Sequence, residues 1–507
     1  MRRLIVSLSF SACAIAPVFA QPGRDTPVKN DQPVSPGRVL LMDSAITTKH
    51  EITIKGQRVP YTAMAGSQPV WDEDGKPVAG VFYTYYERDE IKDRTSRPLV
   101  ISFNGGPGTS SVWMEIGYTG PRLLNIDDEG YPVQPYGLRD NPNSILDAAD
   151  IVFVDPVNTG YSKTANKDIP TSRFFGVNED IRYLADWINT FVTRRGRWAS
   201  PKFLIGESYG TTRVSGLALE LQNAHWMYLN GVILVSPTEL GIQRSGPLDA
   251  ALKLPYFAAT AWYHKKLPAD LQKKDLTDLL PEVELFTINE LLPALSRGGS
   301  LDDAQRKSMA QKIARYSGLT DGTVLENNLD VSFNLFWNAL LRNEGFTVGR
   351  LDSRYKGIDR QTGGESPDYN AELTAWLQAF TPAINIYLRD ELKYKTDLKY
   401  NMFGPVRPWN NSNDRTGENL RQAIAQNPFL HLLVQSGYYD GACDYFNAKY
   451  SMWQLDPSGR LKDRLKWEGY RSGHMMYLRK DDLAAATDNL RKFILESIPA
   501  KGVPAKY

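Results

Sequence analysis

The sequence predicts an α/β fold with a mainly parallel central sheet, on the strength of two observations. Short apolar runs rich in β-branched residues each end in turn residues, and stretches with helical periodicity lie between them. An apolar run without polar alternation is typical of a strand that is buried on both faces of a sheet. Because strands that alternate with helices connect in parallel, they build a sheet covered by helices. The predicted strands are 98–103, 151–154, 203–205, 232–235 and 430–434.

Helical patterns complete this alternation. Residues 180–194 carry apolar side chains on one face, and residues 481–495 give a closing helix. Between about 240 and 400 the pattern changes, because this stretch has helical periodicity and no convincing buried strand. We expect Pro281 in the first turn of its first helix, and we expect Pro382 to kink or split its last helix. The predicted helices of this stretch are 282–292, 302–316 and 371–392.

The N-terminus has the features of a secretory signal peptide. Arg2 and Arg3 form a charged start, residues 4–18 are mostly apolar, and Ala20 is the small residue before a cleavage site. The segment is short for a membrane span and contains Pro17, so we expect export to a periplasm or beyond without stable membrane insertion. The expected parts are a signal peptide at 1–20, a core at 21–240 and 401–507, and a helical cap at 241–400.

The overall composition excludes several classes of partner. Lys and Arg number 59 against 58 Asp and Glu, a balance that argues against a nucleic-acid partner, because such a partner needs a basic stripe. Of the two cysteines, Cys13 lies in the predicted signal peptide, so Cys443 would be the single thiol of the mature chain. The five histidines are scattered, and no Cys/His cluster has metal-ligand spacing. We therefore expect neither a metal site nor a cofactor.

A candidate nucleophile follows the apolar run 202–205. Residues 206–210 read Gly-Glu-Ser-Tyr-Gly, which has the G-x-S-x-G form of a nucleophile elbow. In such an elbow the serine, here Ser208, occupies a sharp turn between a strand and a helix, with its hydroxyl clear of the sheet. The flanking glycines fit this geometry, because a side chain at either place would collide with the neighbouring backbone.

One histidine stands where a base for Ser208 is expected. A serine hydroxyl needs a base to remove its proton, and the base needs an acid to orient it. In α/β-hydrolases these groups follow the chain order Ser, acid, His. Three histidines after Ser208 fall at the end of the elbow helix, in the predicted cap or inside a predicted strand: His225, His264 and His431. Elimination therefore selects His474, in a glycine-containing turn before the last helix.

The orienting carboxylate is expected on a loop after a late strand. The run 430–434 leads to Asp440, which is followed by Gly441, and Asp444 comes shortly afterwards. We favour Asp440, because it is nearer the carboxyl end of the strand. Asp444 is the alternative.

A glycine-rich turn is expected to complete an oxyanion hole. One donor in this fold is the backbone N–H of the residue after the nucleophile, here Tyr209. The second comes from a loop after an earlier strand, and residues 104–108 read Asn-Gly-Gly-Pro-Gly directly after 98–103. Because glycine lets the backbone approach a substrate closely, Gly106 is the predicted second donor and Gly105 the alternative.

Five motifs occur in the order seen in serine carboxypeptidases. They are N-G-G-P-G at 104–108, D-P-V-N-T-G-Y-S at 155–162, G-E-S-Y-G at 206–210, Asp440 with Cys443, and G-H-M at 473–475. The chain resembles this family over about residues 75–495, and it looks nearest to the bacterial branch. The resemblance implies an α/β-hydrolase fold with an inserted helical cap and the removal of single residues from peptide C-termini. It also implies the triad Ser208, Asp440 and His474.

The resemblance further implies that Asn104 and Glu207 bind the terminal carboxylate of the substrate. Two facing carboxyl groups are compatible only if they share a proton, so activity on peptides should favour acidic pH. The chain also departs from the family pattern. Tyr118 stands where better-known members have a glutamate, and Glu115, about one helical turn earlier, is the alternative carboxyl group. Cys443 aligns with a free cysteine near the active site of the family.

Two further departures concern small details of the pattern. Thr109 stands where the family usually has a cysteine, so the corresponding disulfide is absent. The first acid of the G-D-x-D pattern is replaced in residues 437–440, which read Gly-Tyr-Tyr-Asp. These changes leave the expected triad intact.

The sequence therefore predicts an exported serine-type carboxypeptidase that acts through an acyl-enzyme on Ser208. Its expected substrate is a peptide with a free C-terminus. The alternative is an esterase or acyltransferase with the same triad. A non-catalytic binding protein on this fold is disfavoured, because the triad and the oxyanion loop are both intact.

Overall fold

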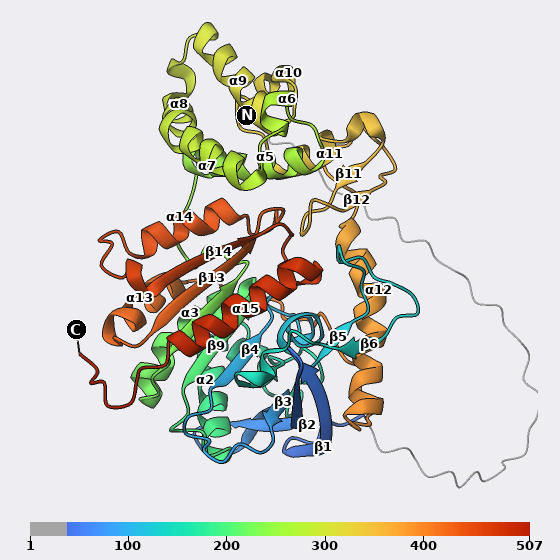
Figure 1. The fold of residues 1–507 in the computed structure, drawn as a ribbon, viewed down its shortest axis with the longest axis vertical. Helices are drawn as coiled ribbons and strands as arrows, with labels where there is room; N and C mark the ends of the chain where they lie inside the picture. The colour runs from blue at the N-terminus through green and yellow to red at the C-terminus, as the bar shows by residue number, and fades with distance from the viewer. Residues whose placement is uncertain (1–37, 507) are drawn as a thin grey trace, which may run out of the picture. The chain divides into compact units, whose positions relative to one another are not determined.

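The computed structural model describes residues 38–506, so the predicted signal peptide lies outside the described residues. Residues from Leu40 onward form one compact unit built on a ten-stranded sheet, in the order β1-β2-β3-β7-β4-β9-β10-β13-β14, with β8 pairing β3 (Figure 1). Within the described residues, no helix combines the length and the apolar character that crossing a membrane requires.

The five predicted strands are confirmed, and they lie side by side. They are β4 (Leu99–Phe103), β7 (Asp150–Val154), β9 (Lys202–Glu207), β10 (Gly231–Val235) and β13 (His431–Gly437). Together with β14 (Leu465–Tyr470) they pair in parallel, so their carboxyl ends meet at one edge of the sheet. The predicted α/β fold with a mainly parallel sheet is correct.

The sequence pattern missed five strands of this sheet, one of them the short β8 (Lys163–Thr164) that pairs with β3. β1 (Ser44–Ile54), β2 (Gln57–Trp71) and β3 (Pro77–Arg88) form an antiparallel extension that pairs with β7. β14 closes the other edge of the sheet. Residues of β1 alternate between partly and fully exposed over most of its length, and every residue of β14 except Tyr470 is only half-buried. Neither strand therefore shows the continuous apolar run that marks the central strands.

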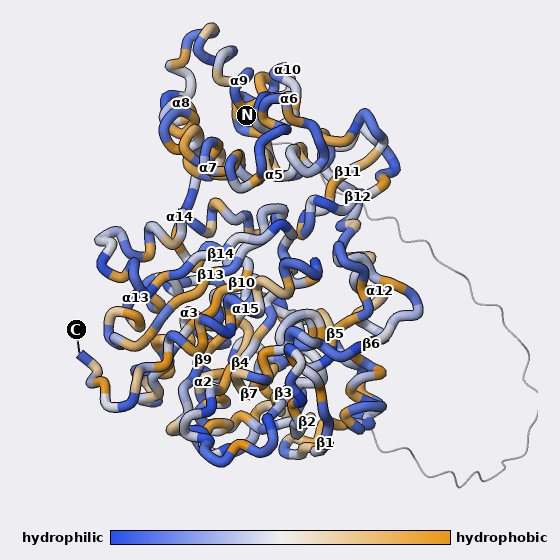
Figure 2. The backbone as a smooth tube through the Cα atoms, in the orientation of Figure 1, coloured by the Kyte–Doolittle hydropathy of each residue, from blue (hydrophilic) through white to orange (hydrophobic). Residues whose placement is uncertain are grey.

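Helices cover both faces of the sheet and bury alternate strand residues. On one face, α2 (Val177–Arg194), α3 (Tyr209–His225) and α13 (Thr416–Gln426) share an apolar cluster with strand residues such as Ile101 and Leu204. On the other face, α15 (Lys480–Glu496) packs on their neighbours, such as Val100 and Ile205. Figure 2 shows the hydrophobic colour concentrated along the central strands.

A largely helical segment follows β10 and has its own apolar core. This core draws on residues between Ala251 and Val348 and is separate from the clusters that cover the sheet. α12 (Ala371–Ile386) lies outside it, because its buried face belongs to the cluster that covers the sheet together with α15. The cap boundaries at 241 and 400 remain predictions.

The expectation for Pro281 was wrong, and of the two outcomes expected at Pro382, a kink or a split, the split does not occur. The first predicted helix begins earlier than Glu282, at Leu276, because the Asp275 side chain accepts a hydrogen bond from the Thr277 N–H and caps the helix there. Pro281 therefore lies inside α7 (Leu276–Phe286). Pro382 lies within α12, which continues past it to Ile386 without being split.

The remaining elements of the described chain are short or peripheral. The helices are α1 (Val112–Met114), α4 (Pro247–Leu252), α5 (Leu254–Tyr263), α6 (Ala269–Gln272), α8 (Leu292–Arg297), α9 (Asp303–Ser317), α10 (Asp321–Glu326), α11 (Phe333–Ala339) and α14 (Tyr445–Leu455). The strands are β5 (Arg122–Leu124), β6 (Leu138–Asp140), β8 (Lys163–Thr164), β11 (Thr347–Val348) and β12 (Lys356–Gly357).

Candidate active site

Ser208 lies in a sharp turn between β9 and α3. Its backbone has φ 56° and ψ −127°, a conformation that a non-glycine residue adopts only at a cost. A Cβ atom at Gly206 would lie 2.1 Å from the carbonyl oxygen of Gly210, and a Cβ atom at Gly210 would lie 2.9 Å from that of Asn104. Both flanking glycines are therefore required by close approach of the backbone, as the sequence predicted.

Asp440 and His474 are hydrogen-bonded partners at the cavity that Ser208 lines. Asp440 leaves the carboxyl end of β13, and His474 follows β14. The Nδ1 atom of His474 lies 2.7 Å from Oδ2 of Asp440. The other carboxylate oxygen of Asp440 accepts hydrogen bonds from the backbone N–H groups of Ala442 and Cys443, at 2.8 and 3.0 Å. These bonds fix the carboxylate, so that it can hold the imidazole in one orientation.

The alternative acid, Asp444, has a different position. Its side chain caps the N-terminus of α14 and accepts a hydrogen bond from the Asn447 N–H at 2.9 Å. The hydrogen bond that His474 makes through Nδ1 goes to Asp440. The geometry therefore favours Asp440 as the partner of the histidine.

The site cavity has a volume of about 810 Å³ and gathers most of the predicted residues. Ser208 and His474 line it together with the residues expected to bind substrate or oxyanion: Asn104, Gly106, Glu207 and Tyr209. Gly105 lines it as well. A cavity of this size, enclosing a few convergent polar groups, is typical of a binding site for a small ligand or the end of a peptide.

The glycine-rich loop 104–108 lies directly against the elbow, and it is called the oxyanion loop after the role that the sequence predicts for it. β4 and β9 pair in parallel with Phe103 opposite Gly206, so the loop after β4 meets the turn after β9. A Cβ atom at Gly105 would lie 2.4 Å from the backbone nitrogen of Tyr209. Gly106 has φ 101°, in the region that favours glycine. Backbone N–H groups of these two segments can therefore converge on one oxygen atom in the cavity.

Asn104 and Glu207 form a hydrogen-bonded pair at the edge of the cavity. Asn104 Nδ2 donates to Glu207 Oε2 at 2.8 Å, and the hydroxyl of Tyr477 donates to the same oxygen. Asn104 Oδ1 accepts from the Met114 N–H at 3.0 Å, which fixes which way the amide points. Sequence reasoning missed Tyr477, because nothing in the sequence links it to a residue so distant along the chain.

Glu207 and His474 influence each other electrostatically. Burial raises the pKa of Glu207, although the nearby His474 and the hydrogen bonds from Tyr477 and Asn104 oppose the rise. Burial lowers the pKa of His474, but Asp440 and then Glu207 outweigh it, and the net pKa lies above the ordinary value. Nε2 of His474 lies 3.8 Å from Oε1 of Glu207, so each charge favours the other.

The two residues considered as substitutes for the missing family glutamate do not line this cavity. Tyr118 is buried, stacks on Tyr477 with ring centroids 4.8 Å apart, and donates to Gln435 Oε1 at 2.7 Å. Glu115 is buried and accepts a hydrogen bond from the Tyr86 hydroxyl at 2.5 Å, and burial raises its pKa to about 8. Tyr118 therefore supports Glu207 through Tyr477, and Glu115 serves another part of the core.

Cys443 does line the cavity. Ligand atoms of Cys443, Asp440 and His474 lie within 4.8 Å of one another, the one such group of three among the residues that the structure describes. Burial raises the pKa of the Cys443 thiol well above its ordinary value. Since the thiolate is the form that binds metals and reacts with electrophiles, this position is poorly suited to either role.

Arg213 is a buried residue of the site that sequence reasoning missed. Its Nε atom pairs with Asp180 Oδ2 at 2.7 Å, and both side chains are fully buried. Its Nη1 and Nη2 atoms donate to the backbone carbonyls of Asn104, at 2.7 Å, and Pro107, at 3.3 Å. One guanidinium group on the elbow helix therefore holds both ends of the oxyanion loop, as its planar fork of donors allows.

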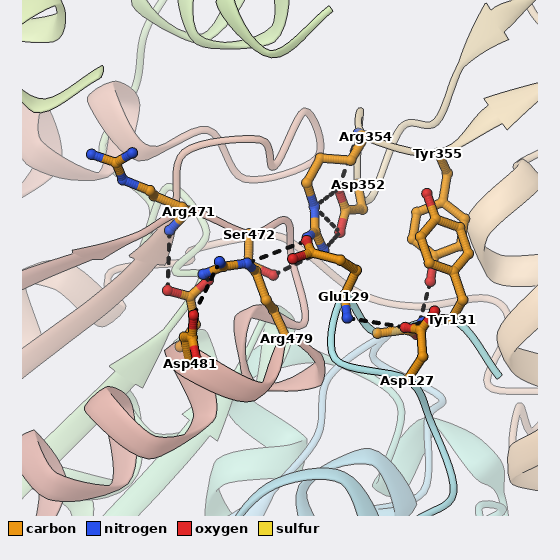
Figure 3. A network of polar contacts seen from close by, with 12 residues as sticks. Asp127, Glu129, Tyr131, Asp352, Arg354, Tyr355, Arg471, Ser472, Arg479 and Asp481 are labelled. Carbon is orange, nitrogen blue, oxygen red and sulfur yellow. Dashed lines mark hydrogen bonds and ion pairs between the residues drawn. The ribbon is translucent and has the colours of Figure 1, made fainter. Parts of the chain in front are cut away.

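A second polar network holds the loop that carries His474 (Figure 3). Arg354 is almost fully buried and pairs with Asp352, and its Nη2 atom also donates to Ser472 Oγ at 3.2 Å. Glu129 bridges Arg354 and Arg479 at 3.2 and 3.3 Å. The network therefore joins the segment that follows β11 to the loops on either side of His474.

Comparisons with known proteins give a family for this arrangement. The family model described as serine carboxypeptidase matches residues 59–489. Serine carboxypeptidase-like 36 of Arabidopsis thaliana is 31% identical over 165 residues, which are 32% of this chain and 32% of that protein. The pheromone-processing carboxypeptidase KEX1 of Saccharomyces cerevisiae is 28% identical over 144 residues, 27% of this chain and 19% of that protein. The chain thus spans a third or less of the curated relatives it matches.

The fold has a counterpart among solved structures. The crystal structure of a prohormone-processing carboxypeptidase from Saccharomyces cerevisiae matches with a TM-score of 0.52 and 15% identity, over 87% of this chain and 93% of the other. At this identity the match supports the α/β-hydrolase fold.

We predict that Arg213→Lys slows reaction at Ser208 about 10- to 100-fold while leaving substrate affinity nearly constant. Lysine keeps the charge that pairs with Asp180 but cannot donate to both carbonyls, so the oxyanion loop loses its fixed position. The measurement is kcat and KM separately, with the rate of fluorophosphonate labelling of Ser208.

Arg182→Lys is the matched control, because Arg182 lies exposed on α2 and pairs with Glu179. The expected result is no change in any of these rates. If Arg213→Lys lowered activity only in proportion to the amount of folded protein, its contacts would serve stability alone.

Proposed function

Because this chain belongs to the serine carboxypeptidase family, we propose that it is a serine-type carboxypeptidase. It releases C-terminal residues from peptides through an acyl-enzyme on Ser208. The observation that carries the proposal is one cavity that Ser208 and His474 line together with the hydrogen-bonded pair Asn104 and Glu207. A nucleophile with its base and a group suited to a free carboxylate thus lie within reach of one peptide end.

In the proposed mechanism, Ser208 attacks the carbonyl carbon of the last peptide bond. His474 takes the serine proton through Nε2 and then gives it to the leaving amine, while Asp440 holds Nδ1 and stabilises the imidazolium. The backbone N–H groups of Tyr209 and Gly106 stabilise the oxyanion, each contributing about 3–4 kcal/mol. Water then hydrolyses the acyl-enzyme by the same steps, with His474 again acting as the base.

The terminal carboxylate of the substrate would bind at Asn104 and Glu207. Two carboxyl groups can lie face to face only when one of them is protonated, because its O–H group then donates a hydrogen bond to the other. The buried position of Glu207 raises its pKa and so favours the protonated form. Tyr477 and Asn104 hold the glutamate in place for this contact.

An esterase or acyltransferase with the same triad is the second candidate. The observation that favours it is the position of Tyr118, which is buried behind Tyr477 and leaves the cavity without a second carboxyl group at the family position. Such an enzyme would use Ser208, Asp440 and His474 in the same roles but would not need a free carboxylate on its substrate.

We further propose export of the mature protein to a periplasm or beyond, on the evidence of the signal-peptide features at 1–20. The assignment to the bacterial branch of the family rests on the sequence motifs. The substrate class is a peptide with a free C-terminus, and nucleic acids are not expected partners, because the charges of the chain balance.

The central test compares blocked dipeptides that end in a free carboxylate with the same dipeptides ending in an amide. A carboxypeptidase should turn over the free acids at least about 100-fold faster by kcat/KM, because the amides leave the buried polar groups at Asn104 and Glu207 unpaired. Ser208→Ala is the control for contaminating activity. Equal turnover of the two sets would exclude a carboxypeptidase and support the esterase reading.

The choice between the two aspartates has its own test. We predict that Asp440→Asn lowers kcat about 10⁴-fold, because the imidazole then takes the wrong tautomer and loses its ionic partner. Asp444→Asn is the matched control. It should leave kcat within about threefold of wild type and change stability little, because asparagine caps a helix about as well as aspartate. A comparable loss of kcat in both variants would contradict the assignment.

The third test concerns the pH dependence of KM and kcat. The acid form of Glu207 binds the substrate carboxylate, so KM for peptides should rise as pH rises through the raised pKa of Glu207. The neutral form of His474 is the base, so kcat should fall as pH falls through the raised pKa of His474.

Glu207→Gln should change the pH dependences of KM and kcat in different ways. It should remove the rise of KM at high pH, and it should move the acid limb of kcat to lower pH, because His474 loses a negative neighbour. Amidated or ester substrates serve as the control, since they carry no terminal carboxylate. A wild-type KM that does not vary with pH would refute this role of Glu207.

A further inference from the structure

Most charged side chains that line the cavity have partners. Glu239 pairs with Arg244 at 3.0 Å, and Asp249 pairs with Lys253 at 3.4 Å. The remaining carboxyl groups are held by hydrogen bonds: Asp444 from Asn447, and Glu207 from Asn104 and Tyr477. The acidic groups of the lining are therefore already neutralised or buried within the protein.

Two arginines of the lining have no such partner. Arg350 and Arg407 are exposed residues that line the cavity, and neither belongs to any of the ion pairs found between residues 38 and 506. The buried carboxyl group of Glu372 lies near Arg350 but forms no ion pair with it. Its Oε1 accepts a hydrogen bond from the backbone N–H of Leu351, and burial raises its pKa to about 7. The cavity thus offers positive charge that the protein itself leaves unpaired.

The two arginines are anchored on different segments of the site. The carbonyl oxygen of Arg350 accepts from the Gly441 N–H at 2.9 Å, so its backbone is fixed beside the turn that carries Asp440. Arg407 follows a segment that packs on the oxyanion loop, where the Gly404 N–H donates to the Gly108 carbonyl at 2.7 Å. One cation therefore borders the histidine side of the site, and the other borders the oxyanion side.

Arg350 also lies close enough to act on the triad. After burial, Asp440 and Glu207, its positive charge is the next influence on the pKa of His474, which it lowers. It likewise lowers the pKa of Cys443, which burial and Asp440 raise. A substrate residue next to the scissile bond is therefore within electrostatic reach of Arg350.

We propose that Arg350 and Arg407 make this site selective for peptides with an acidic side chain next to the scissile bond. The proposal rests on the proposed function for the reaction, but the selectivity itself is a property of binding. A guanidinium group pairs with a carboxylate through two parallel hydrogen bonds, whereas it repels lysine or arginine side chains. Because both arginines are exposed, solvent and salt screen the pair and keep the preference modest.

The first experiment measures kcat/KM for blocked dipeptides that differ only as Glu against Gln. One pair places the acid in the leaving residue, and the other places it in the residue that forms the acyl-enzyme. Wild type should prefer Glu over Gln about five- to tenfold in at least one pair, and added salt should reduce the preference. Equal turnover of Glu and Gln peptides at both positions would overturn the proposal.

Variants assign the preference to its residue. Arg350→Gln and Arg407→Gln should each bring the Glu-to-Gln ratio toward one for the position that the arginine faces, and Arg350→Lys should retain part of it. Arg139→Gln is the control, because Arg139 lies exposed on β6, away from the cavity lining. A Glu-to-Gln ratio that persists in both glutamine variants would overturn the proposal. The proposal would also be overturned if the glutamine variants lost only the preference for free acids over amides. The arginines would then bind the terminal carboxylate of the substrate and not an acidic side chain.

A binding arm separates this proposal from the proposed function. Ser208→Ala protein is titrated with the same peptides, and the ratio of dissociation constants for Glu and Gln peptides is measured without turnover. A five- to tenfold preference for Glu, lost in the Ser208→Ala/Arg350→Gln or Ser208→Ala/Arg407→Gln protein, supports the selectivity even if wild type cleaves no peptide. Equal affinities refute it even if wild type proves to be an active carboxypeptidase.

Discussion

The site depends on how closely the carboxyl ends of β4 and β9 approach each other. Phe103 lies opposite Gly206 in the parallel ladder, and Gly105 lies so near the Tyr209 nitrogen that any side chain there would collide with it. This contact places the glycine-rich turn over the start of α3. Arg213, one turn further along that helix, then fixes the carbonyl oxygens of the same turn. The serine and the backbone N–H groups proposed as oxyanion donors are thus positioned by one packing constraint.

Buried charge is the second feature that organises the site. Asp440, His474 and Glu207 are all removed from water, and each is held by hydrogen bonds from the surrounding loops. Low accessibility makes their charges depend strongly on one another, so the protonation of the glutamate and that of the histidine are coupled. If Glu207 binds substrate as proposed, the same burial that positions His474 also links that binding to pH. The arginines at the rim add a positive charge that the protein does not compensate.

Much of the fold and the site could be predicted from particular residues. The central strands were visible because each is an unbroken apolar run, and Ser208 was visible because its turn needs glycines on both sides. β1 and β14 were missed, since their half-exposed residues do not form such runs. The start of α7 was misplaced, because the cap at Asp275 outweighs the signal of Pro281. Tyr477 and Arg213 were missed because their partners are distant along the chain.

The sequence by itself determined the α/β class, the order of the chemical groups and the glycines that the elbow and its facing loop require. These features are local, since a strand, a turn and a close approach each leave their mark within a few residues. Only the tertiary structure decided that His474 pairs with Asp440 rather than with Asp444, and that Tyr118 lies behind Tyr477. It also decided which arginines of the cavity stay unpaired. Such pairings join segments far apart in the chain, so they exist only once the sheet and the helical segment have packed together.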